Sequence, residues 1–98
     1  MKISISSVKF KADKKLEDFI QEKITKLAGN YDNLISGEVT IRLDNSANQE
    51  NKIAEIRLNI PGNDLFAKKQ CKTFEEATDS ALDALKKQLV KHKDKMHP

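Results

Sequence analysis

The sequence is poor in the residues that define several common protein classes, with one cysteine, no tryptophan, three glycines and two prolines among 98 residues. A single cysteine excludes an internal disulfide and is typical of a reducing compartment. The glycines stand too far apart for a phosphate-cradling loop. No run approaches the roughly 20 apolar residues of a membrane span, and the first residues lack the apolar core of a secretory signal. We therefore expect a cytoplasmic protein that has no membrane partner.

The sequence also lacks a pattern that predicts catalysis. His92 and His97 are five residues apart, so they would diverge on a helix, and Cys71 has no cysteine partner. A lone cysteine in a strand usually packs as a small apolar residue. Asp79 and Asp83 share one helix face, where solvated charge explains them better than acid–base chemistry. We predict no enzymatic activity, no metal site, no cofactor and no small-molecule substrate.

The chain is long enough for one domain, residues 1–98, with a single apolar core. Its net charge of +3 is unevenly distributed along the sequence. Residues 1–30 carry +3, residues 31–65 carry −3, and residues 66–98 carry +3. Concentration of basic charge at both ends of the chain favours a polyanionic partner more than the modest total does.

The apolar periodicity predicts four strands and two helices in the order β-α-β-β-β-α. The expected strands are 2–8, 38–43, 54–60 and 65–72, and the expected helices start after Asp13 and at Thr73. Asp13 is a candidate N-cap, Gly29 and Asn30 favour a left-handed helix end, and Pro61-Gly62 favours a turn. This is an α+β fold with a four-stranded mixed sheet. Strands one and two are expected to be parallel and strands two to four to form an antiparallel meander, with both helices on one face.

The last predicted helix, residues 73–95, changes charge halfway along. Thr73 and Glu76 have the spacing of a capping box. An apolar stripe of Phe74, Ala81, Leu82, Leu85 and Leu89 predicts one buried face. Lysines lie off this stripe: Lys87, Lys91 and Lys95 form a row opposite it, and Lys86 and Lys93 flank it. Ammonium groups about 6 Å apart along a helix suit a phosphate backbone.

Three features have plainer explanations that the sequence leaves open. Acids at a helix start and bases at its end are favoured by the helix dipole alone. Five lysines exceed what that effect requires, and only Asp83 and Lys87 form an i, i+4 pair. Lys15, Lys23 and Lys26 along the first helix could equally form a solvated face. Phe66 is expected on the exposed sheet face, where a lone aromatic is more often ordinary surface than a base-stacking platform.

Two segments carry a resemblance to a known family. They are residues 87–96, with the sequence KQLVKHKDKM, and residues 19–27, with the sequence FIQEKITKL, followed by Tyr31-Asp32. Together with the element order, they resemble the short hibernation-promoting factors and ribosome-associated inhibitor A, also called protein Y. The resemblance covers the whole chain, and its C-terminal run is the more specific part.

The resemblance implies a stress or stationary-phase factor for ribosome hibernation that binds the small ribosomal subunit near the decoding region. Such a factor inhibits translation by blocking messenger RNA and transfer RNA. The resemblance also implies a fold similar to a double-stranded RNA-binding domain with an extra strand. The basic residues at matching positions, to which we add Lys86, are the predicted contacts to 16S-type rRNA: Lys23, Lys26, Lys86, Lys87, Lys91, Lys93 and Lys95.

The chain departs from the family pattern at three places. Glu75 stands where a tyrosine is common, and Ala84 stands where a basic residue is common, so Lys86 is taken to supply that charge. Long members carry a second, dimerising domain, whereas this sequence ends at Pro98. We therefore expect a single ribosome-binding domain. Because one core consumes the strong apolar stripes, we also expect a monomer when the protein is free. A general structured-RNA-binding module and a protein–protein adaptor remain alternative functions.

Overall fold

The computed structural model describes residues 2–31, 33–45 and 49–96, with side chains described as far as Lys91. The elements are β1 (Lys2–Val8), α1 (Lys14–Gly29), β2 (Ser36–Leu43), β3 (Lys52–Ile60), β4 (Asn63–Cys71) and α2 (Phe74–Met96). The order is the predicted one. β2, β3 and β4 each begin two residues earlier than expected, and β4 ends one residue earlier.

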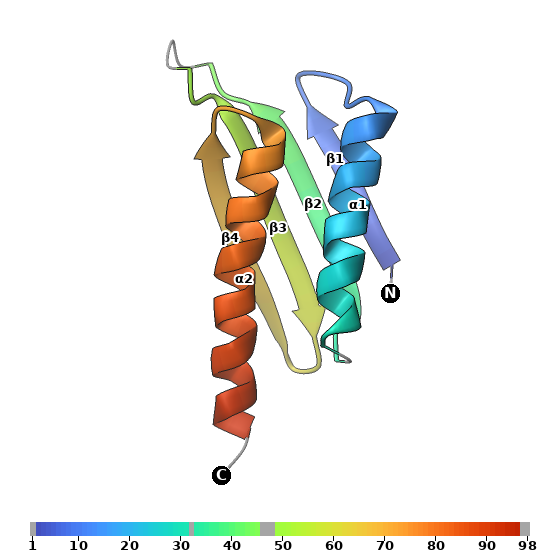
Figure 1. Cartoon of the computed structure of the whole chain (residues 1–98), viewed down its shortest axis with the longest axis vertical. Coiled ribbons are helices and arrows are strands. Elements are labelled where there is room, and N and C mark those ends of the chain that lie inside the picture. The colour runs from blue at the N-terminus through green and yellow to red at the C-terminus, as the bar shows by residue number, and fades with distance from the viewer. Residues whose placement is uncertain (1, 32, 46–48, 97–98) are drawn as a thin grey trace.

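The four strands form one sheet in the order β1-β2-β3-β4. β1 pairs with β2 in parallel, with Ile5 opposite Val39, and the other two pairs are antiparallel. A two-residue turn at Pro61 and Gly62 joins β3 to β4, and Gly62 has the positive φ of 78° that this turn requires. Both helices cover the same face of the sheet and lie beside each other (Figure 1). The predicted layer arrangement is confirmed.

The core lies between the sheet and the two helices. Ile20 and Ile24 of α1 are fully buried, and so is Leu85 of α2. They pack over a floor of buried strand residues that includes Val39, Ile41, Ile56 and Leu58. Burial of each such side chain stabilises the fold by about 1.5–3 kcal/mol. The predicted apolar stripes are therefore the surfaces that hold both helices on the sheet.

Two residues depart from the expected pattern of burial. Ile53 is buried although it lies on the face away from the helices, in a row between Arg42 and Gln70. The long side chains of these neighbours can cover it. Thr78 of α2 is completely buried, and its hydroxyl has no hydrogen-bond partner among the described residues. Neither feature follows from the periodicity of the sequence.

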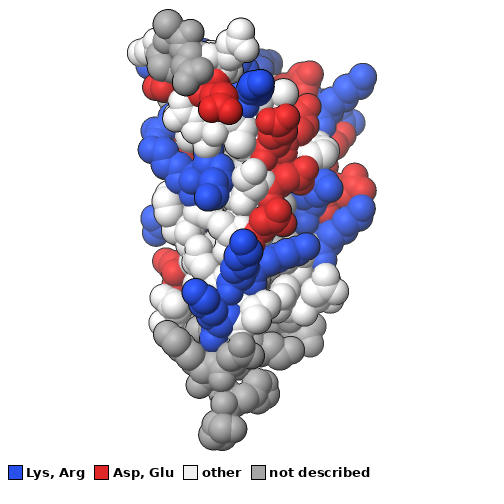
Figure 2. Space-filling view, turned by 60° about the vertical axis from the view of Figure 1, so that its left-hand side comes forward, with Lys and Arg blue, Asp and Glu red and all other residues white. Residues whose placement is uncertain are grey.

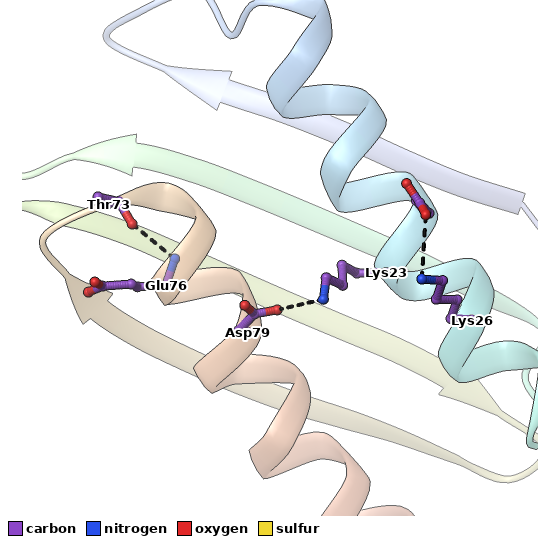
Figure 3. Close-up of polar contacts among 6 residues, drawn as sticks. Lys23, Lys26, Thr73, Glu76 and Asp79 are labelled. Atoms are coloured by element: carbon purple, nitrogen blue, oxygen red, sulfur yellow. Dashed lines mark hydrogen bonds and ion pairs between the residues drawn. The ribbon is translucent and has the colours of Figure 1, made fainter.

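The start of α1 has the expected N-cap, and the start of α2 has half of the expected capping box. The Asp13 carboxylate accepts a hydrogen bond from the Leu16 amide at 2.9 Å, so Asp13 is the N-cap of α1. The Thr73 hydroxyl accepts from the Glu76 amide at 3.0 Å, which is the hydroxyl half of the expected capping box (Figure 3).

The left-handed end predicted for α1 is wrong. Asn30 has φ −97° and ψ −7°, which is right-handed, and Gly29 is the last helical residue. The Asn30 amide donates to the Leu27 carbonyl at 3.1 Å, and the Tyr31 amide donates to the Ala28 carbonyl at 3.2 Å. These i to i−3 bonds tighten the last turn and satisfy the helix carbonyls without a positive φ.

Candidate nucleic-acid interface

A groove of about 400 Å³ runs between α1 and α2. Its lining residues come from both helices: Lys23, Lys26 and Leu27 of α1 with Asn30 directly after it, and Asp79, Leu82, Asp83 and Lys86 of α2. The groove therefore contains three ammonium groups and two carboxylates. The apolar stripes bring these charges together, because burying one face of each helix places the polar edges of both helices against each other.

Two of the groove lysines are paired with acids. Lys23 Nζ lies 3.6 Å from Asp79 Oδ1 across the two helices, and Lys26 Nζ lies 3.5 Å from Glu22 Oε1 within α1 (Figure 3). The Lys23 ammonium also lies 5.4 Å from the centre of the Phe19 ring. All four charged side chains are at least 40% exposed, so each pair contributes at most about 1 kcal/mol. A phosphate group could replace either carboxylate at little cost.

The second half of α2 forms the more strongly basic end of the site. A hollow of about 430 Å³ is lined by Tyr31, Lys86, Lys87, Val90 and Lys91. Lys86 lines both the groove and this hollow, so the two lie next to each other. Figure 2 shows acidic side chains gathered along the upper part of this side of the molecule, with lysines below them. We call the side chains of Lys23, Lys26, Lys86, Lys87 and Lys91 the basic surface.

The structure brings together five of the seven predicted contact residues, and they belong to two elements far apart in the sequence. Lys93 and Lys95 lie in α2, but their side chains are outside the described part of the structure. Lys87 and Lys91 are exposed, as expected. They line the same hollow as Lys86.

Sequence reasoning missed two members of this site, Tyr31 and Val90. Tyr31 was taken only as part of the connection after the first helix. Val90 is an apolar residue that is 48% exposed among lysines. An apolar residue that falls between the lysines of a helix, off the core stripe, was the available signal. The closeness of Tyr31 to it depends on how the helices pack.

The opposite face of the sheet is a weaker candidate for binding RNA because both of its arginines are paired with acids. Arg42 bonds Glu55 at 2.8 Å, and Arg57 lies 3.8 Å from Asp64. Phe66 is 45% exposed on this face, as expected, and the Arg57 guanidinium lies 5.7 Å from the centre of its ring. An internal cation–π contact already occupies this aromatic ring.

The arrangement offers hydrogen-bond donors and positive charge, the groups that bind phosphate oxygens. In residues 2–31, 33–45 and 49–91, the structure contains no group of three or more His, Cys, Asp or Glu side chains placed to hold a metal ion. Among these same residues, no helix has the length and apolar character that crossing a membrane requires. Cys71 is a free, half-buried thiol that packs against the core.

The profile of the family described as Sigma 54 modulation protein / S30EA ribosomal protein matches residues 3–97. The ribosome hibernation promoting factor of Azotobacter vinelandii is 30% identical over 95 residues, which cover 97% of this chain and 85% of that protein. The factor of the same name from Pseudomonas putida is 26% identical over 95 residues, covering 97% of this chain and 89% of that protein.

Two solved structures share the fold. A ribosomal subunit interface protein from Coxiella burnetii superposes with a TM-score of 0.84 at 18% identity, covering 96% of this chain and 99% of that one. The N-terminal domain of Thermus thermophilus protein Y superposes with a TM-score of 0.76 at 21% identity, covering 90% of this chain and 94% of that one. At these identities the likeness establishes the fold. The family expected from the sequence is confirmed by the profile and the relatives: this chain belongs to the Sigma 54 modulation protein / S30EA ribosomal protein family, together with the ribosome hibernation promoting factors.

Proposed function

We propose that this protein is a ribosome hibernation factor that binds the small ribosomal subunit near the decoding region and so blocks messenger RNA and transfer RNA. It would act in the cytoplasm, under stress or in stationary phase, as a monomer when free. The observation that carries the proposal is the basic surface, where five lysines from two helices lie on one side of the molecule. The relatives are named as ribosome hibernation factors, and this suggests that the polyanion bound by the basic surface is the ribosome.

The physical basis of binding would be release of counterions from rRNA. Each lysine that neutralises a phosphate frees condensed cations, so the affinity depends steeply on salt. The core holds both helices on the sheet, which fixes the spacing of their lysines before binding. The helices need not rearrange on binding, so the entropy lost is mainly that of the lysine side chains. Occupation of the decoding region would then exclude other RNA by simple overlap.

The test is a titration of purified small subunits with the Lys87→Glu/Lys91→Glu variant. Both side chains are exposed, so the free energy of unfolding should change by no more than about 1 kcal/mol. We expect affinity to fall by at least about 100-fold, because two attractive contacts become repulsive. For the unmodified protein with four to six phosphate contacts, a fourfold rise in salt should cost about two to three decades in affinity.

The matched control is Lys2→Glu/Lys14→Glu, which changes the net charge equally. Lys2 lies on β1 and Lys14 starts α1, and neither lines the groove or the hollow. This control should bind within about threefold of the unmodified protein. The small loss would come from the weaker long-range attraction between the protein and the RNA. If both variants bind as the unmodified protein does while keeping native circular dichroism spectra, the basic surface is not the binding site.

The same titration separates the alternative functions. A general structured-RNA-binding module would bind an unrelated RNA duplex as tightly as it binds small subunits. A protein–protein adaptor would bind neither the small subunit nor the RNA duplex, and the two charge-reversal variants would behave alike. The proposed function requires preference for the small subunit and loss of that preference in Lys87→Glu/Lys91→Glu only.

A further inference from the structure

The hollow shares Lys86, Lys87 and Lys91 with the basic surface, and its apolar floor includes an aromatic side chain, which the lining of the groove lacks. Tyr31 follows α1 directly, and its backbone is held by two hydrogen bonds. Its amide donates to the Ala28 carbonyl at 3.2 Å, and its carbonyl accepts from the Leu34 amide at 3.4 Å. The side chain is half-buried and packs against the core. Tyr31 is therefore a positioned aromatic residue rather than a free surface side chain.

Val90 supplies the other apolar part of this floor. It is 48% exposed on α2, although the neighbouring Leu89 is 2% exposed in the core. A single exposed valine is ordinary on a protein surface. Here, however, it shares one hollow with the Tyr31 side chain, and the three remaining lining residues are all lysines. The hollow thus combines an aromatic and aliphatic floor with ammonium groups around it.

We propose that this hollow receives an unstacked nucleobase of single-stranded RNA, packed on Tyr31 and Val90. Lys86, Lys87 and Lys91 would bind the phosphates that flank this base. Bases turned out of a stack pack on aromatic side chains, and adjacent cations hold their backbone. The inference rests on the proposed function and refines it, because it assigns an RNA element to one part of the interface.

The charges of the hollow select this occupant over others. Its lining contains three cationic residues and no carboxylate. The occupant must therefore be polyanionic and must also present a flat apolar group between its charges. Single-stranded RNA meets both conditions at every nucleotide, whereas paired RNA hides its bases inside the helix. An acidic peptide with an aromatic side chain meets them only for particular sequences, and it serves as the competing case in the test.

The composition of the protein makes the test direct. Tyr31 is the only tyrosine, and the chain has no tryptophan, so tyrosine fluorescence reports this site alone. The probe is an RNA of about eight nucleotides, compared with an abasic strand that has the same number of phosphates. We expect the RNA to quench Tyr31 emission and to bind about 5- to 150-fold tighter than the abasic strand. The abasic strand should still bind through the lysines, with little quenching.

Variants then locate the stacking contribution. Tyr31→Phe keeps the ring and should keep the preference for RNA over the abasic strand, measured by competition. Tyr31→Leu should reduce that preference to less than about threefold, and Val90→Asp should also reduce it, because it removes the apolar contact to the base. Phe66→Leu is the matched control, since Phe66 is an exposed aromatic on the opposite sheet face. It should leave the preference unchanged.

Different results would overturn this inference and the proposed function. Equal affinity for the two strands without quenching, in a protein that still binds small subunits, would refute the base site and leave the proposed function standing. Stronger quenching and binding by an acidic phenylalanine-containing peptide than by RNA would also refute it, in favour of a protein partner. Failure of small subunits and of both strands to bind would refute the proposed function itself. Circular dichroism of each variant checks that folding is retained.

Discussion

The two halves of α2 have different roles, although one continuous helix contains both. In residues 74–83, Ala77 and Ala81 are fully buried, and the charged Asp79 is paired with Lys23 of α1. In residues 84–96, Leu85 and Leu89 still hold the core, but Lys86, Lys87 and Lys91 form no ion pair within the described part of the chain. The last turns of α2 extend past the turn between β3 and β4 (Figure 1).

This difference indicates where the chain satisfies its own charges and where it leaves them available. The first half has acids in its first turn, Glu75 and Glu76, which suit a helix N-terminus, and a further acid, Asp79, pairs with the neighbouring helix. The second half gathers like charges on one side, which repel each other until an anion binds. We infer that the first half of α2 serves mainly the fold, and that the second half serves mainly binding.

The largest expected effect tests whether the apolar stripe holds both halves. Leu85 has no exposed surface, so Leu85→Ala should lower the free energy of unfolding by about 3 kcal/mol through lost burial and a cavity. The adjacent exposed Lys86→Ala should change it by less than about 0.5 kcal/mol. Urea denaturation measures both. A loss below about 1 kcal/mol for Leu85→Ala would mean that the second half is not anchored to the core.

A smaller effect is expected at Thr78, a buried polar residue in the first half of α2. Thr78 buries a hydroxyl that has no partner among the described residues, so Thr78→Val should raise the free energy of unfolding by about 1 kcal/mol. Thr25→Val is the control, because the Thr25 hydroxyl is exposed and donates to the Gln21 carbonyl at 2.7 Å. Thermal unfolding of both variants gives the comparison. Destabilisation by Thr78→Val would show that the hydroxyl has a partner, such as an ordered water.

A further prediction concerns the ion pair that links the first half of α2 to α1. Asp79→Asn removes a carboxylate from the groove and frees Lys23 for phosphate, so affinity for small subunits should rise about threefold. Asp64→Asn is the control, since Asp64 pairs with Arg57 on the other face of the sheet. Titration at constant salt distinguishes them. Weaker binding of Asp79→Asn would mean that the ion pair positions Lys23 for binding.

The smallest expected effect is at Cys71. Its sulfur lies 3.9 Å from the Ser80 hydroxyl, against the first half of α2, and no chemistry is assigned to it. Cys71→Ser should therefore leave affinity for small subunits unchanged within about twofold, with a stability loss of about 1 kcal/mol or less. The assignment would be wrong if a variant with native circular dichroism no longer bound.

The sequence was sufficient to predict the features that depend on neighbours three or four residues apart, or on alternation along a strand. It predicted the element order, the Asp13 cap and the stripes that bury Ile24 and Leu85, because these follow from local periodicity. The end of α1 was mispredicted, since Gly29 permits a left-handed residue but does not require one. There, i to i−3 hydrogen bonds end the helix instead.

The candidate site also has features that the sequence predicted and features that only the tertiary structure decided. The lysine rows of both helices could be read from the sequence, because spacing alone places residues on a helix face. Only the tertiary structure decided that Asp79 pairs with Lys23, and that Tyr31 and Val90 share a hollow with Lys87. These contacts join residues about 50 or more positions apart, and they depend on how the two helices lie across the sheet. Which charges are paired and which remain available is set by that packing.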